Sequence, residues 1–222
     1  MKNQKKLAIF LRAFIVLAVV ALVSPVQAVK NSKLVVKADL PLPQLIAYAS
    51  GDIDIFWQQN FNSFRRRYTQ PRMFHYYQPF MTPCGNALMN NAFYCSASNG
   101  IYYDYNFISR TYSNVGDFAA VSILAHEWGH LVQAQLGILR GRYFSIQLEL
   151  QADCFAGAYT KYAEATNKLE EGDLEEAGVG LFNSGDQRGT PWFNPQAHGK
   201  PMQRINAFLT GYNGGVGACF SR

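Results

Sequence analysis

The sequence lacks several features that would place it outside the globular proteins. Charged residues make up only 16% of its 222 positions and hydrophobic residues 49%, which argues against an intrinsically disordered chain. No internal repeat or low-complexity tract is present. The length and composition therefore predict a single globular domain with a hydrophobic core.

The sequence also has no apolar run long enough to span a bilayer comfortably. Its longest run covers residues 13–23, whereas a membrane-spanning helix needs about 20 apolar residues. Small residues suited to a cleavage site follow at 26–28. The basic residues of this N-terminal segment are Lys2, Lys5, Lys6 and Arg12. These features predict a signal peptide over residues 1–28, a domain over 29–222, and a periplasmic or secreted location. An uncleaved membrane anchor is the alternative.

Little net charge is left once the signal is set aside. The signal carries four of the 20 basic residues and none of the 15 acidic ones, so the remainder has 16 minus 15, a net charge of +1. A basic surface for nucleic acid or anionic membranes is therefore not implied. We interpret the one local basic run, residues 65–67, as a solvated surface. We expect no nucleic-acid partner, and membrane contact only if the N-terminal segment is retained.

Cysteines are few, and no C-x-x-C pair is present. The four cysteines are Cys84, Cys95, Cys154 and Cys219. Their irregular spacing argues against a cysteine-ligated zinc site, and their even number in an exported chain predicts two disulfides. Three pairings are possible. We favour Cys84 with Cys95, which closes a short loop, and Cys154 with Cys219, which ties the last segment to a central helix.

The hydrophobic spacing predicts an α+β domain. Helical spacing covers about residues 43–64 (with a possible break near Gly51), 114–136, 145–163, a segment starting at 173, and 200–209. Aromatic and β-branched residues predict strands near 73–77, 92–94 and 101–104, and a short β-prone stretch occurs at 34–36. The second helix is apolar on several sides, so we expect it to be buried near the middle of the domain, ending at Gly137. Asp173 and Glu176 resemble a capping box.

The buried helix contains the motif H-E-x-x-H, formed by residues 126–130. His126 and His130 lie one helical turn apart on the same face, so both imidazoles can bind one Zn²⁺ ion. Glu127 is rotated by about 100° and can act as general base for a zinc-bound water. Burying two histidines and a glutamate in an apolar helix would be costly without a compensating cation, which favours a metal site over a chance match.

A catalytic zinc site needs a third protein ligand and a position open to water. Glu149 and Asp153 lie one turn apart on the next predicted helix. We expect Glu149 to bind the metal and Asp153 to accept a hydrogen bond from the far nitrogen of a zinc-bound histidine. The reverse assignment, with Asp153 as the ligand, is the main alternative.

The chain has four histidines, and the other two differ in context. His75 lies in an aromatic strand and is interpreted as structural. His198 stands in a loop before the helix that contains Arg204. Either side chain could hydrogen-bond the oxyanion of a tetrahedral intermediate, and for Arg204 a salt bridge to Asp153 is the structural alternative.

These residues predict hydrolysis with one Zn²⁺ per chain. Zinc lowers the pKa of its bound water, and Glu127 takes the proton and passes it to the leaving amine. We expect an endopeptidase acting on a peptide or protein substrate, with the strand at 101–104 as the edge to which an extended peptide adds. Two alternatives stay open: a zinc amidase acting on the cell wall, and a zinc-binding envelope module without turnover.

Blocks along most of the chain resemble the bacterial neutral zinc metallopeptidase family. They comprise Cys84-Gly85, residues 93–95, 101–104, 124–130 and 149–157, His198-Gly199, Gln203-Arg204, Gly211-Tyr212 and Cys219. The resemblance implies a zincin-like fold, with a small sheet on the active-site helix and a gluzincin ligand set, H-E-x-x-H with a later E-x-x-x-D. Asn91-Ala92 and residues 96–99 depart from the family's pattern. These departures lie outside the proposed metal set and concern the substrate side.

Overall fold

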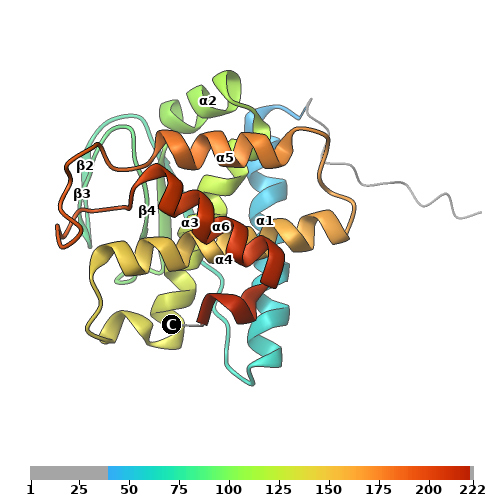
Figure 1. The fold of residues 1–222 in the computed structure, drawn as a ribbon. Coiled ribbons are helices and arrows are strands. Elements are labelled where there is room, and N and C mark those ends of the chain that lie inside the picture. The colour runs from blue at the N-terminus through green and yellow to red at the C-terminus, as the bar shows by residue number, and fades with distance from the viewer. Residues whose placement is uncertain (1–39, 221–222) are drawn as a thin grey trace, which may run out of the picture. The chain divides into compact units, whose positions relative to one another are not determined.

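The computed structural model describes residues 40–220, all of which belong to one structural unit. The elements are α1 (Leu42–Ser63), β1 (Arg72–Tyr76), β2 (Phe80–Thr82), β3 (Gly85–Ala87), β4 (Ala92–Cys95), β5 (Gly100–Asp104), α2 (Tyr105–Asn114), α3 (Asp117–Leu136), α4 (Ser145–Ala165), α5 (Asp173–Asn183) and α6 (Pro201–Gly214) (Figure 1). Short 3-10 helices cover Ile138–Arg140 and Val216–Phe220. This is a mixed α+β fold. Within the described part, no helix is both long and apolar enough to cross a membrane.

Most of the expected elements are confirmed, with boundaries shifted by a few residues. Helix α1 continues through Gly51 without a break, and α2 was not expected from the sequence. The signal peptide at residues 1–28 and the β-prone stretch at 34–36 lie outside the described residues. Helix α3 ends where expected, because Gly137 adopts the left-handed conformation with φ 80°.

The sheet has three strands in the order β1-β5-β4, and β2 and β3 form a separate hairpin. Strand β5 is central: it pairs in parallel with β1 and antiparallel with β4. The expectation that β5 accepts a substrate peptide is therefore wrong, because both of its edges are already hydrogen-bonded. Its five buried residues are typical of a central strand. Within the described part of the chain, β4 pairs only with β5 and has a free edge.

Helix α3 packs against several other helices and one strand. Its neighbours include α4, α5, α2, α1 and the edge strand β4. Trp128, Leu131 and Val132 are almost completely buried in the core around it. The expected central position of the H-E-x-x-H helix is thus confirmed.

The expected capping box at the start of α5 is not formed. Gly172 occupies the N-cap position, and Asp173 accepts a hydrogen bond from the amide of Glu170. Glu176 instead accepts the amide of Phe118, in the first turn of α3, at 2.9 Å. The acidic side chain that resembled a local cap therefore satisfies an amide of another helix.

Two disulfides link the segments, in the pairing favoured from the sequence. Cys84, in the turn of the β2–β3 hairpin, is bonded to Cys95 at the end of β4. Cys154 in α4 is bonded to Cys219 in the last 3-10 helix. Two disulfides are typical of proteins that fold in an oxidising compartment, which indicates an extracellular or periplasmic location.

Helices α4 and α6 cross at small residues and make the most extensive contact between elements of the fold (Figure 1). A Cβ atom added to Gly211 of α6 would lie 1.8 Å from the carbonyl oxygen of Cys154. A Cβ atom on Gly157 of α4 would lie 1.9 Å from the carbonyl oxygen of Phe208. Only glycine allows the two backbones to approach this closely.

We expect Gly211→Ala to lower the free energy of unfolding by about 1–3 kcal/mol, because the added methyl group forces the two helices apart. Gly178→Ala in α5 is the matched control, since its Cβ would have no atom within 4 Å. The control should be neutral or stabilise by up to about 1 kcal/mol, because alanine favours the helix. Denaturant unfolding with the disulfides intact measures both. Equal effects of the two variants would contradict the role of the crossing.

Candidate metal centre

The two histidines of α3 face one point in the structure. The Nε2 atoms of His126 and His130 lie 3.1 Å apart, as expected for residues one helical turn apart. His126 is buried and His130 is partly exposed. Both side chains line the same cavity, so a metal ion there would be reachable from solvent.

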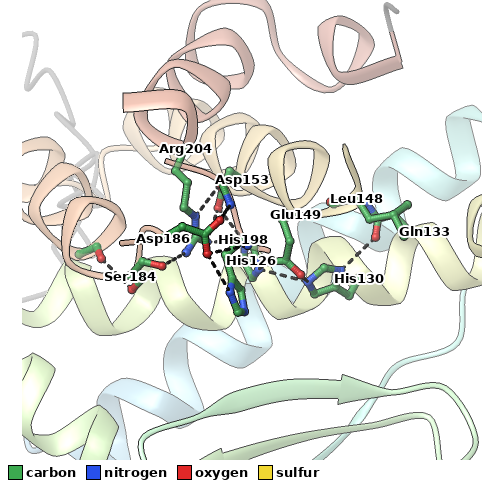
Figure 2. Close-up of polar contacts among 12 residues, drawn as sticks. His126, His130, Gln133, Leu148, Glu149, Asp153, Ser184, Asp186, His198 and Arg204 are labelled. Carbon is green, nitrogen blue, oxygen red and sulfur yellow. Dashed lines mark hydrogen bonds and ion pairs between the residues drawn. The ribbon is translucent and has the colours of Figure 1, made fainter. Parts of the chain in front are cut away.

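Glu149 of α4 completes a triangle of ligand residues. One of its carboxylate oxygens lies 3.2 Å from His126 Nε2, and the other lies 3.3 Å from His130 Nε2 (Figure 2). The close approach of α4 to α3 depends on Gly129, where a Cβ atom would lie only 2.8 Å from the Cα atom of Ala152. The glycine inside the H-E-x-x-H motif therefore allows Glu149 to reach the two histidines.

Each histidine is oriented by a hydrogen bond at its other ring nitrogen. His126 Nδ1 lies 2.7 Å from Asp153 Oδ1, and His130 Nδ1 lies 3.0 Å from Gln133 Oε1 (Figure 2). Both partners are acceptors at these atoms, so the Nδ1 atoms carry the protons. The Nε2 lone pairs are then free for a metal ion.

Arg204 of α6 holds Asp153 in place. Its Nε and Nη2 atoms donate to the two carboxylate oxygens of Asp153 at 2.9 and 2.8 Å, and its Nη1 atom donates to the carbonyl oxygen of Ser184. Both charged side chains are buried, so this paired geometry compensates their loss of water. These contacts favour the supporting role for Arg204 over that of an oxyanion donor.

The charges of the three converging residues are strongly coupled. Burial alone would lower the pKa of His126, but the carboxylates of Asp153 and Glu149 raise it to about 10. Burial alone would raise the pKa of Glu149. Hydrogen bonds from His126 and His130 outweigh this effect and hold the pKa of Glu149 well below its usual range. Without a metal the site favours protonated histidines beside an ionised Glu149. Metal binding must therefore displace a proton from His126, so metal affinity should decrease as the pH is lowered.

Glu127 lies on the same helix but outside the triangle. Its side chain is 5% exposed, and its Oε2 atom has no hydrogen-bond partner in the described structure. Burial raises the pKa of Glu127, and the neighbouring His126 and His130 partly offset this shift. A carboxylate with a free oxygen and a raised pKa, facing a cavity, has the properties of a general base.

The cavity that contains these residues has a volume of about 590 Å³. Its walls come from β4, α3, α4, α5 and the loop before α6, including Phe93 and Tyr94 of the edge strand. His198 lines the same cavity, and its side chain is 52% exposed. Asp186 accepts the amides of His198 and Gly199, which fixes the loop that carries the histidine.

A family model described as "Putative neutral zinc metallopeptidase" matches residues 16–221. The chain belongs to this family. The description of this metallopeptidase family indicates a zinc-dependent hydrolase. The cluster of His126, His130 and Glu149 has the composition that such a metal site requires.

Several curated proteins are similar to this chain over about two thirds or more of its length. The uncharacterized protein YpfJ of Escherichia coli K12 is 33% identical over 182 residues, which cover 72% of this chain and 63% of YpfJ. The uncharacterized proteins Mb2605 of Mycobacterium bovis and Rv2575 of Mycobacterium tuberculosis are 32% identical over 177 residues, covering 67% of this chain and 60% of each relative. The aligned chain thus spans less than two thirds of these relatives. No solved structure matches the chain.

Two residues that support the candidate metal centre were not found from the sequence. Gln133 is completely buried, and besides its contact with His130 it donates to the carbonyl oxygen of Leu148 and to Gln151. Its position three residues after His130, within an apolar stretch, was a signal that could have identified it. Asp186 had no comparable local signal, because it reaches His198 only through the fold of the loop.

Proposed function

We propose that this chain is a zinc-dependent endopeptidase with a zincin-like fold, in which His126, His130 and Glu149 hold one zinc ion. The observation that carries the proposal is the convergence of three ligand residues. The two Nε2 atoms lie 3.1 Å apart, and His126 and His130 each approach a different carboxylate oxygen of Glu149, at 3.2 and 3.3 Å. Ligand atoms about 2.0–2.1 Å from a tetrahedral zinc ion lie about 3.3 Å from one another. Imidazole and carboxylate donors also suit zinc.

A zinc ion bound there would lower the pKa of a water molecule and polarise the carbonyl group of a substrate. Glu127 then takes a proton from the attacking water through its free Oε2 atom and delivers it to the nitrogen of the leaving amine. His198, on the rim of the same cavity, donates a hydrogen bond to the developing oxyanion. Asp153 and Gln133 keep the two histidines in the tautomer that binds the metal.

The free edge of β4 is the best candidate for binding an extended peptide. Residues 92–94 of this strand line the cavity, and the other edge of the strand is already paired with β5. A peptide added to β4 would gain backbone hydrogen bonds without dependence on its side chains. This arrangement suits an endopeptidase, because a bound segment can extend beyond both ends of the cavity.

We also propose that residues 29–222 form the enzyme domain and that residues 1–28 direct its export. The two disulfides support export, since such bonds persist in oxidising compartments. Retention of the N-terminal segment as a membrane anchor is the alternative.

Metal removal tests the proposal directly. We expect the purified full chain to contain one zinc ion per molecule and to cleave members of a peptide library, as read by mass spectrometry. Chelation should abolish cleavage, because the carbonyl group is then no longer polarised, and added zinc should restore it. Stoichiometric zinc without cleavage would favour a binding module. A chain that takes up no stoichiometric zinc would contradict the proposal.

A further inference from the structure

Three exposed aromatic side chains form a continuous ridge at the start of α4 and in the loop before α6. We define the aromatic ridge as Phe144, Trp192 and Phe193, which are 46, 58 and 61% exposed. The ring centroids of Phe144 and Trp192 lie 4.4 Å apart, and those of Trp192 and Phe193 lie 5.9 Å apart. Removing apolar ring surface from water is favourable, and soluble proteins rarely expose contiguous apolar patches without a function. The ridge therefore indicates a binding surface.

The ridge belongs to two segments that the fold holds together. Phe144 directly precedes α4, and the other two residues lie in the loop between α5 and α6, at the left of Figure 1. Ser145 donates to the carbonyl oxygen of Pro195 at 2.7 Å, which attaches the loop to the start of α4. Asp186 closes the base of the loop by bonding Gly199. The aromatic rings are therefore presented by an organised loop.

The segments around the ridge are basic and contain no acidic residue. Residues 138–148 include Arg140 and Arg142, and residues 187–200 include Arg188 and Lys200, but neither segment contains aspartate or glutamate. All four cations are exposed, and none of them forms an ion pair with a residue of the described range 40–220. This charge complements an anionic surface.

We propose that the aromatic ridge and its flanking arginines dock the protein on an anionic lipid bilayer. Aromatic rings beside arginines are suited to the interface between lipid headgroups and acyl chains. A stable protein partner typically covers about 800 Å² on each side, far more than three rings provide, whereas a bilayer needs only a few anchors.

The docking does not depend on the proposed hydrolysis. If the chain both docks on membranes and hydrolyses peptides, the cavity would face peptide segments that emerge at the membrane surface. His198 lies in the same loop as Trp192 and Phe193, and Glu149 lies in the first turns of α4, which begins directly after Phe144.

Trp192 provides an internal reporter for the test. The chain has three tryptophans, and Trp57 and Trp128 are 0 and 1% exposed. The full-length chain is mixed with vesicles of acyl-brominated phosphatidylcholine, with or without about one third phosphatidylglycerol. We expect blue-shifted and quenched tryptophan emission on the anionic vesicles, and no such change in Trp192→Phe. This signal reports the ridge itself even if the N-terminal segment also binds the vesicle.

The charge contribution is tested with matched pairs of variants. Arg140→Gln with Arg142→Gln should weaken the quenching titration by about fivefold for each charge, roughly 25-fold together. Arg66→Gln with Arg67→Gln, two exposed arginines of the loop after α1, should leave it unchanged. Three results would overturn the proposal: chain bound to vesicles with Trp192 unquenched, equal losses in both pairs, or a Trp192 response to peptides alone.

Discussion

Glu127→Gln should reduce kcat/KM for peptide hydrolysis by a factor of about 10² to 10⁴ while the protein still binds one zinc ion per chain. Glutamine has nearly the same shape, so the packing of this 5% exposed side chain on α3 should be preserved. It has no carboxylate that can accept a proton from water. The metal triangle is unaffected, because Glu127 is not one of its three ligand residues.

Glu175→Gln is the matched control for this variant. Glu175 is exposed on α5 and does not line the cavity, so its conversion to glutamine should leave both rate and zinc content unchanged. Steady-state kinetics on a peptide identified from the library and metal analysis of the same samples provide the two readouts. A Glu127→Gln variant with wild-type kcat/KM would refute the general-base role. A variant without zinc would place Glu127 among the groups that maintain the metal site.

Removing Glu149 should have the largest effect on metal binding. Glu149→Ala deletes one of three ligand residues and leaves His126 and His130 alone at the site, so we expect the chain to lose stoichiometric zinc. Asp153→Asn keeps an acceptor for His126 Nδ1 and removes only its charge. It should weaken zinc affinity by about 10- to 100-fold, the usual range for groups that orient a ligand.

Alanine at position 153 needs a separate stability measurement. Asp153→Ala would leave the buried Arg204 without its carboxylate partner, at an expected cost of about 3–5 kcal/mol in the free energy of unfolding. The affinity comparison therefore uses Asp153→Asn, with Glu164→Ala as a control at an exposed glutamate of α4. Competition with a zinc chelator gives the affinities. A greater loss for Asp153→Asn than for Glu149→Ala would make Asp153 the ligand.

The helical pair His126 and His130 was predictable because it depends on local geometry alone. Any α-helix places residues four apart on one face, so the motif defines the direction of both imidazoles before the fold is known. Glu149 and Asp153 were recognised by the same spacing. Which of the two faces the Nε2 atoms of the histidines depends on how α4 is rotated against α3, where the helices approach closely at Gly129 and Ala152.

The substrate side was less predictable because it depends on the order of strands. The sequence indicates strands near residues 92–94 and 101–104, and both exist. It does not reveal that β5 lies between β1 and β4, which leaves β4 as the edge strand that lines the cavity. The start of α5 is a second case in which sequence spacing did not predict the partner. Glu176 accepts a hydrogen bond from an amide of α3 rather than from its own helix.

The clustering of basic residues on one part of the surface could not be predicted from the net charge. A net charge of +1 outside the N-terminal segment suggested no anionic partner, yet Arg142 and Arg188 flank one aromatic ridge whose members are far apart in the chain.

The sequence by itself determined the helix that carries His126, Glu127 and His130, because backbone hydrogen bonds set the spacing within a helix. Tertiary structure decided which of Glu149 and Asp153 faces the Nε2 atoms of the two histidines, which strand lies at the edge beside the cavity, and which distant segments form the aromatic ridge. These features depend on which distant surfaces pack together, and that is set by the shapes of many side chains at once.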